Sequence, residues 1–197
     1  MKTLSKVYMW IVFALLYAPI ILIVLFSFNK AGSLSHFSTF SLKWYGELFH
    51  SPVALDALKN SLILAVSSSV IATVIGTLAA FGISRMRSRY FKTAVQSVTN
   101  IPMMNPDIVT GVSMMLLFVA SMSIPFSPIK GLGFTTMLIA HTTFNLPYVI
   151  LSVLPRFQQM DKSLTEASLD LGCTPARSFF KVELPLVMPG VISGLML

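Results

Sequence analysis

Long apolar stretches separated by short polar segments dominate this chain of 197 residues. A helix needs about 20 predominantly apolar residues to cross a hydrocarbon core of about 30 Å. Four regions reach that length, at residues 7–28, 61–83, 93–124 and 134–154. The pattern predicts an all-α, polytopic membrane protein in which one transmembrane domain occupies residues 1–197.

Two of the apolar regions depart from a simple straight span. Pro102 and Pro106 fall inside 93–124, and because proline removes a backbone donor we expect a break or kink there. Apolar sequence also resumes at 190 and continues to 197. That is about 12 Å of helix at 1.5 Å per residue, so we expect four spans and the start of a fifth.

The second apolar region carries small residues at every fourth position, which places them on one face of a helix. Small side chains allow another helix backbone to approach closely inside a membrane. We therefore expect this face to be a packing surface. Its members are Ser68, Ala72, Gly76 and Ala80.

Composition supports a membrane location and excludes several other classes. The chain is 55% hydrophobic and only 11% charged, with a mean hydropathy of +0.80, which leaves too little polar surface for a soluble globule. The first apolar region is too long for the core of a signal peptide, so we interpret it as a retained signal anchor. The single cysteine, Cys173, excludes an internal disulfide, and we expect no metal site.

The distribution of Lys and Arg predicts the orientation, because cytoplasmic loops retain them. With the amino terminus inside, 10 of the 14 basic residues lie on the cytoplasmic side. This accounts for most of the net charge of +7, so we expect no nucleic-acid binding. The ten are Lys2, Lys6, Arg85, Arg87, Arg89, Lys92, Arg156, Lys162, Arg177 and Lys181.

The polar segment 156–189 therefore faces the cytoplasm, and its residues predict two short helices. Ser163 and Glu166 have the spacing of a capping box at a helix start. Gly172 suits the left-handed turn that ends this first helix. A second helix starts at Thr174-Pro175 and is expected to end at Leu184-Pro185. An ordinary interfacial loop is one interpretation of this pair of helices.

The apolar residues of that segment favour another interpretation, a surface covered by a partner. They are Leu171, Phe179 and Phe180. The spacing of further residues points the same way. The pattern Glu-Ala-Ser-x3-Gly-x9-Val-x-Leu-Pro closely resembles the EAA signature of permease subunits of binding-protein-dependent ABC importers, which have the MetI-like fold. It comprises Glu166, Ala167, Ser168, Gly172, Val182, Leu184 and Pro185.

The resemblance implies a role and a set of partners. In that family this segment is the coupling helix that fits a cleft of the ATPase, and the family implies an ATPase dimer, a second permease subunit and a periplasmic solute-binding protein. No Gly-x4-Gly-Lys-Ser/Thr loop occurs in the chain, so ATP is expected on a partner, with no cofactor and no enzymatic site here. The resemblance places the protein in a bacterial inner membrane.

Shorter stretches resemble the polyamine branch of the family, of the spermidine/putrescine PotC type. They are Lys43-Trp44-Tyr45, Ser84 to Arg87, Pro106 to Val109, and His141-x5-Pro147. Such permeases have six spans, so four spans and a stub indicate a fragment or a truncated permease unable to transport.

Five residues are candidates for the substrate pathway. Asp107 is the only carboxylate in the expected spans, and a charge at mid-membrane costs about 2.5–3.5 kcal/mol on insertion scales. Asn105-Pro106-Asp107 also fits a helix start, where a carboxylate favours the positive dipole end. Trp44 and Tyr45 could hold an amine by cation–π contact or anchor the interface.

His141 and Asn145 share one helix face and could line a cavity or bond a neighbouring helix. An ion-coupled transporter or channel, with Asp107 and His141 as a relay, is the competing class. Such a protein has no need of the two capped helices on the cytoplasmic side, and that feature favours the importer.

Overall fold

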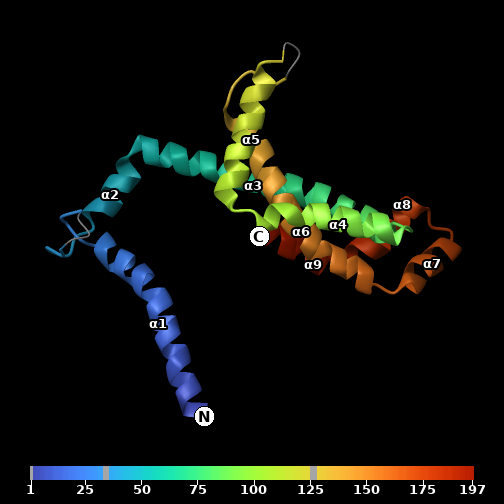
Figure 1. Ribbon diagram of the computed structural model, residues 1–197, viewed down its shortest axis with the longest axis horizontal. Helices are drawn as coiled ribbons and strands as arrows, with labels where there is room; N and C mark the ends of the chain where they lie inside the picture. The colour runs from blue at the N-terminus through green and yellow to red at the C-terminus, as the bar shows by residue number, and fades with distance from the viewer. Residues whose placement is uncertain (1, 33–35, 125–127) are drawn as a thin grey trace. The chain divides into compact units, whose positions relative to one another are not determined.

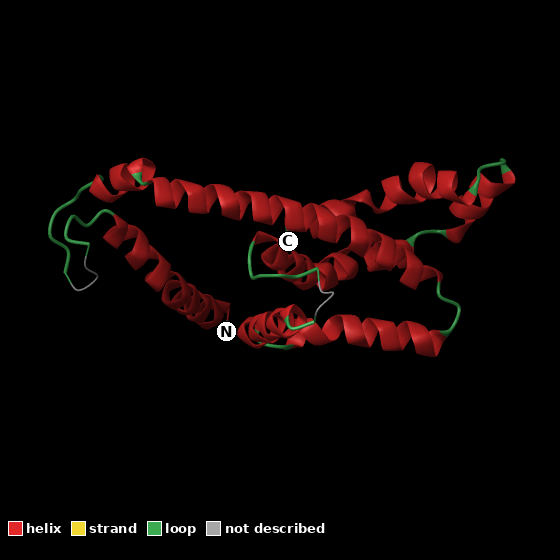
Figure 2. Cartoon of the chain, turned by 90° about the horizontal axis from the view of Figure 1, so that it is seen from above, coloured by secondary structure: helices red, strands yellow, loops and turns green. Residues whose placement is uncertain are grey.

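The computed structural model describes residues 2–32, 36–124 and 128–197. Helices and loops make up this part of the chain, with one isolated β-bridge between Asn29 and Phe40 and no β-strand among the described residues (Figure 2). The all-α prediction is confirmed. The chain forms two compact units, residues 1–60 and 61–197, and each is described by itself.

The first unit contains α1 (Lys2–Ser27), α2 (Lys43–His50) and the beginning of α3 (Pro52–Arg85) (Figure 1). One buried side chain organises the loop between α1 and α2. Asn29 donates from Nδ2 to the His36 carbonyl at 2.8 Å, and its Oδ1 accepts from the Ser38 amide at 3.0 Å. A single amide side chain thus satisfies backbone groups on both sides of the loop.

We expect Asn29→Ala to loosen this loop, because the backbone groups that Asn29 satisfies would lose their partner at about 1–3 kcal/mol each. Hydrogen exchange at the Lys30 and Ser41 amides, which bond to carbonyls across the loop, should accelerate. Asn60→Ala is the control, because Asn60 is exposed in the same unit. Equal exchange rates in both variants would contradict the conclusion that Asn29 holds this loop in place.

The second unit contains the rest of α3 and seven further elements (Figure 1). They are α4 (Arg89–Met104), α5 (Asp107–Met122), α6 (Phe134–Gln159), α7 (Lys162–Asp170), α8 (Pro175–Ser178), the π-helix η1 (Phe179–Glu183) and α9 (Leu184–Met196). Figure 1 shows α7 and α8 together at one end of α6, while α5 leaves at a steep angle.

Small residues allow α3, α6 and α9 to pack closely. All four members of the predicted small-residue face of α3 are buried, which confirms it as a packing surface. A Cβ at Gly76 would lie 2.7 Å from Val149 Cγ1 on α6, and one at Gly190 on α9 would lie 2.8 Å from the Ser152 carbonyl oxygen. Val153 and Val187 are almost completely buried in this core.

The third apolar region is broken, as predicted, and the break is sharp. Helices α4 and α5 are bent by 105° at residues 105–106, as in a broken span or a re-entrant loop. Asn105 closes α4, and Pro106 precedes the first residue of α5, Asp107. The helix start therefore lies one residue later than the pattern Asn105-Pro106-Asp107 indicated, because Pro106 has a non-helical ψ of 133° and takes the N-cap position itself.

The last helix begins much earlier than the apolar pattern indicated. Elements α8, η1 and α9 follow without interruption, so a candidate span covers Pro175–Met196 and not merely 190–197. The expected helix end at Leu184-Pro185 is wrong. A π-turn precedes the proline, in which the Leu184 amide bonds to the Phe179 carbonyl, and this wider turn relieves the i−4 contact that makes proline break a helix.

Four helices are long and apolar enough to cross a membrane, or up to five if the bent pair counts as one span. The other three single helices are Lys6–Ser27, Pro52–Arg85 and Phe134–Gln159. They contain the spans expected at 7–28, 61–83 and 134–154, except that the first helix ends at Ser27. Helix α3 is longer than the expected span 61–83, because residues 52–60, which precede the apolar region, are also helical.

Candidate functional site

The polar segment folds as an elbow, which we define as α7, the turn after it and α8 (residues 162–178). Helix α7 is capped by Asp161, whose side chain accepts from the Ser163 amide at 3.0 Å. The expected capping box of Ser163 and Glu166 is therefore wrong. The extended Asp161 takes the cap position, which places Ser163 inside the first turn, where its amide needs an acceptor.

The turn of the elbow has the predicted left-handed glycine. Gly172 has a φ of +83°, and the amides that follow α7 bond back to its last turn, the Gly172 amide to the Leu169 carbonyl and the Cys173 amide to the Ser168 carbonyl. Thr174 then caps α8 by accepting from the Arg177 amide, as predicted. The chain thus reverses between two satisfied helix ends.

The elbow has an exposed outer face. Glu166 and Ala167 are exposed, Leu171 keeps 86% of its surface accessible, and Phe180 of η1, just after the elbow, keeps 63%. Phe179, which we expected on the same surface, is buried at 7% exposure. Its ring packs against Phe81 of α3 and Phe157 of α6, whereas the next side chain along the helix, Phe180, points to a different side.

The remaining signature residues serve the inner side of the elbow and its continuation into α9. Ser168 is buried, and its hydroxyl bonds to that of Ser178 on α8. Val182 and Leu184 are half-buried, and Leu184 packs against the core, whereas Pro185 is exposed in the first turn of α9. The signature therefore divides into an exposed face and an anchored base.

Sequence reasoning missed the residue that joins the elbow to α3. Glu183, unassigned within Val182-x-Leu184-Pro185, is 2% exposed and pairs with Arg85 at the end of α3 at 2.5 Å. Thr165 of α7 donates to the same carboxylate at 3.2 Å. The available signal was a carboxylate in a mainly apolar stretch, which needs a partner when buried.

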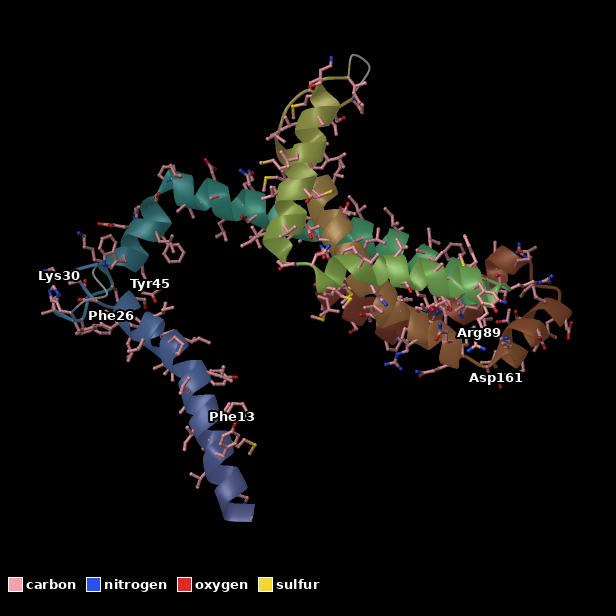
Figure 3. The ribbon with its side chains drawn as sticks, viewed as in Figure 1. Phe13, Phe26, Lys30, Tyr45, Arg89 and Asp161 are labelled. Carbon is pink, nitrogen blue, oxygen red and sulfur yellow. The ribbon has the colours of Figure 1, made fainter. Side chains whose placement is uncertain are left out.

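These residues border a pocket of about 330 Å³ at the elbow end of the second unit. It is lined by groups from α3, α4, α6, α7 and η1, including Arg85, Lys92, Lys162 and Glu183. Figure 3 shows Arg89, at the start of α4, and Asp161, before α7, at this same end. The basic residues between 85 and 92 and the polar elbow are thus brought together (Figure 3).

Two of the five pathway candidates lie together. His141 and Asn145 of α6 line a cavity of about 500 Å³ with Ser68, Ser69 and Tyr148. Asn145 donates to the Ser68 hydroxyl across the helix interface at 3.5 Å, and His141 Nδ1 lies 2.9 Å from the Met137 carbonyl oxygen. Both residues therefore line the cavity, but only Asn145 bonds a neighbouring helix, because the His141 contact stays within α6.

The other three candidates lie elsewhere. Asp107 is exposed at the start of α5 and does not line that cavity. Trp44 and Tyr45 belong to the first unit, where Trp44 Nε1 donates to the Asn29 carbonyl at 3.0 Å and the Tyr45 hydroxyl lies 2.9 Å from Ser27 Oγ. Figure 3 labels Tyr45 and Phe26 in this unit.

Asp161→Ala should fray the first turn of α7. The Ser163 backbone amide and hydroxyl, in that order, lower the pKa of the Asp161 carboxyl below its ordinary value of 3.8. The carboxylate therefore contributes its full stabilisation above about pH 3.8 and loses it as the pH falls through the lowered pKa. Hydrogen exchange at the Ser163 amide measures this, and Asp161→Asn, which still accepts, should retain protection without the pH dependence.

The comparisons with known proteins agree with this architecture. Residues 72–197 match the family of the binding-protein-dependent transport system inner membrane component. The chain belongs to this family of transport permease subunits, which are multi-pass proteins of the inner membrane and not enzymes. The resemblance inferred from the elbow is confirmed.

Polyamine permeases are among the similar proteins. The chain is 39% identical over 194 residues to the spermidine/putrescine transport system permease protein PotC of Haemophilus influenzae, covering 98% of this chain and 72% of the relative. It is 35% identical over 185 residues to the putrescine transport system permease protein PotI of Escherichia coli K12, covering 94% and 66%. The chain thus spans about two thirds of the length of the curated relatives it matches.

Proposed function

We propose that this protein is a transmembrane subunit of an ATP-driven importer that carries spermidine, putrescine or a related polyamine across the inner membrane. The similarity to PotC and PotI over 94–98% of the chain supports the substrate class. The observation that carries the coupling role is the elbow, whose outer face is exposed while Phe179 of η1, directly after it, is buried against α3 and α6. An exposed apolar patch on an anchored element is suited to a protein partner.

The proposed assembly contains this subunit, a second permease, an ATPase dimer and a periplasmic solute-binding protein. ATP is bound by the ATPase, since the chain lacks a phosphate-binding loop. The amino terminus and the elbow are cytoplasmic, which the clustering of Arg and Lys between 85 and 92 and around the elbow supports. Glu166 and Ala167, together with the exposed Leu171, form the face that meets the ATPase.

The substrate pathway of this proposal includes the cavity bordered by His141 and Asn145. Its hydroxyl, amide and imidazole groups accept hydrogen bonds from an ammonium group without binding it tightly, as a pathway requires. Asp107, Trp44 and Tyr45 are proposed contacts elsewhere along the route. Of these, Trp44 has Lys43 Nζ 5.3 Å from its ring centroid, and this contact supports a role of the indole in facing an ammonium group.

Reconstitution of the subunit with its ATPase, second permease and binding protein tests the function. Labelled spermidine and putrescine should accumulate only when ATP is present inside the cytoplasmic compartment, and Asp107→Asn should lower the rate. Uptake that persists after ATP is depleted, or that follows an ion gradient, would identify the protein as an ion-coupled transporter instead.

Crosslinking directly tests whether the exposed face of the elbow contacts the ATPase. A photoreactive residue at Leu171, which is 86% exposed, should crosslink to the ATPase. The same residue at the buried Val187 provides the control. Crosslinks from position 171 that reach only lipid or periplasmic protein would refute the coupling role.

A further inference from the structure

One polar network connects the elbow to the end of α3. Glu183 Oε1 accepts from Arg85 Nη2 and from Thr165 Oγ1. Arg85 belongs to the last turn of α3, Thr165 to α7, and Glu183 to η1, which leads into α9. Three elements therefore meet at a single carboxylate oxygen.

The environment of Glu183 strengthens the hydrogen bonds of this network. Glu183 is 2% exposed, whereas the Arg85 side chain is about half exposed. Charge-assisted hydrogen bonds are roughly twice as strong as neutral ones, and the low dielectric around a buried carboxylate strengthens them further. Arg85 also lies 5.4 Å from the Phe81 ring centroid, which holds the guanidinium in place.

The elbow itself is joined to this network internally. The buried hydroxyls of Ser168 and Ser178 bond α7 to α8, and Phe179 packs against Phe81 of α3. Helix α7 is thus bonded to Arg85 through Thr165 and Glu183, in addition to the covalent links of the elbow to α6 and α9. Contiguous bonded networks between rigid elements are a physical route for such coupling.

We propose that Glu183 is a positioning residue for transport, which ties the elbow to α3 through Thr165 and Arg85 so that movement of the elbow displaces α3. This inference rests on the proposed function, because it specifies how the elbow acts once an ATPase moves it. The pair of Arg85 on α3 and Glu183 on η1 makes the cavity-lining helix α3 respond directly, whereas the backbone alone connects the elbow only to α6 and α9.

The experiment measures substrate transported per ATP hydrolysed in the complete reconstituted complex. Glu183→Gln keeps the shape but removes the charge, and this ratio should fall about tenfold because the bonds to Arg85 and Thr165 weaken. Thr165→Val should lower it about threefold by removing one of the two hydrogen bonds to the carboxylate, and Thr165→Ser, which keeps the hydroxyl, should restore it. Lys92→Gln removes a cation that lines the same pocket and should leave the ratio unchanged.

A merely structural role of Glu183 gives a different result. Assembly of the complex and its melting temperature would then fall together with transport, and the transport obtained per ATP by the remaining complex would equal that of the unaltered protein. That result, or an unchanged ratio in both Glu183→Gln and Thr165→Val, would overturn the inference. If Glu183→Gln does not assemble, the Thr165→Val and Thr165→Ser pair decides the question.

The outcome is separable from that of the proposed function. Failure of the unaltered subunit to bind an ATPase at the elbow would refute the importer assignment itself. Normal ATPase binding and normal uptake in the unaltered protein, with an unchanged ratio in the variants, would refute only the connection through Glu183.

Discussion

Replacing Gly172 with valine is expected to reduce ATP-dependent uptake at least about tenfold while membrane insertion stays normal, because a β-branched residue at this left-handed position costs on the order of 1–3 kcal/mol. Gly172 has a φ of +83° and open space around its Cα, with nothing within 4 Å of an added Cβ. The penalty is therefore conformational and not steric. It falls on the turn that sets the angle between α7 and α8.

Gly172→Asn is the matched control, because asparagine tolerates the left-handed region better than other non-glycine residues. Uptake by the asparagine variant should lie between that of the valine variant and that of the unaltered protein. Membrane fractionation checks insertion, and labelled polyamine uptake in the reconstituted complex checks function. Equal uptake by the valine variant and the unaltered protein would show that the geometry of the turn has no part in coupling.

Replacing Gly190 with alanine is expected to destabilise the second unit by about 1–3 kcal/mol, the usual cost of overpacking. An added Cβ would lie 2.8 Å from the Ser152 carbonyl oxygen and 2.8 Å from Arg156 Cγ. The arginine side chain can move aside, but the backbone carbonyl of α6 cannot. Helix α9 would have to shift away from α6 along their shared interface.

Gly82→Ala is the control for this experiment. Gly82 lies within α3 and has nothing within 4 Å of an added Cβ, so only helix propensity changes, by up to about 1 kcal/mol in favour of alanine. Thermal unfolding in detergent should therefore give a lower melting temperature for Gly190→Ala and an equal or higher one for Gly82→Ala. Equal melting temperatures in the two variants would mean that α6 and α9 are not closely packed at Gly190.

Local patterns predicted much of the fold because their physical causes lie within a few residues. The lengths of the apolar regions, the break near Pro106, the left-handed Gly172 and the Thr174 cap depend on backbone sterics or on bonds to near neighbours. The small-residue face of α3 was also predictable, since a four-residue interval repeats along one side of a helix.

Local patterns gave wrong predictions where two neighbouring residues suited the same structural role, or where contacts with distant parts of the chain determined the conformation. Asp161 and Ser163 both suit a helix cap, and the structure uses Asp161. Pro185 normally ends a helix, but the π-turn before it allows the chain to continue into α9. Phe179 was expected on a surface covered by a partner, because it is an apolar residue in a polar segment. In the structure its ring packs against aromatic rings of α3 and α6.

The sequence by itself determined that this protein is helical, that it belongs in a membrane and that it carries an elbow with the signature of an importer permease, because hydropathy, capping and turn chemistry act over short distances along the chain. Only the tertiary structure decided which face of the elbow is exposed and which is anchored. Arg85 and Glu183 are 98 positions apart. No local rule pairs them, and they meet because close packing of α3, α6 and α9 brings the end of one helix to the base of the elbow.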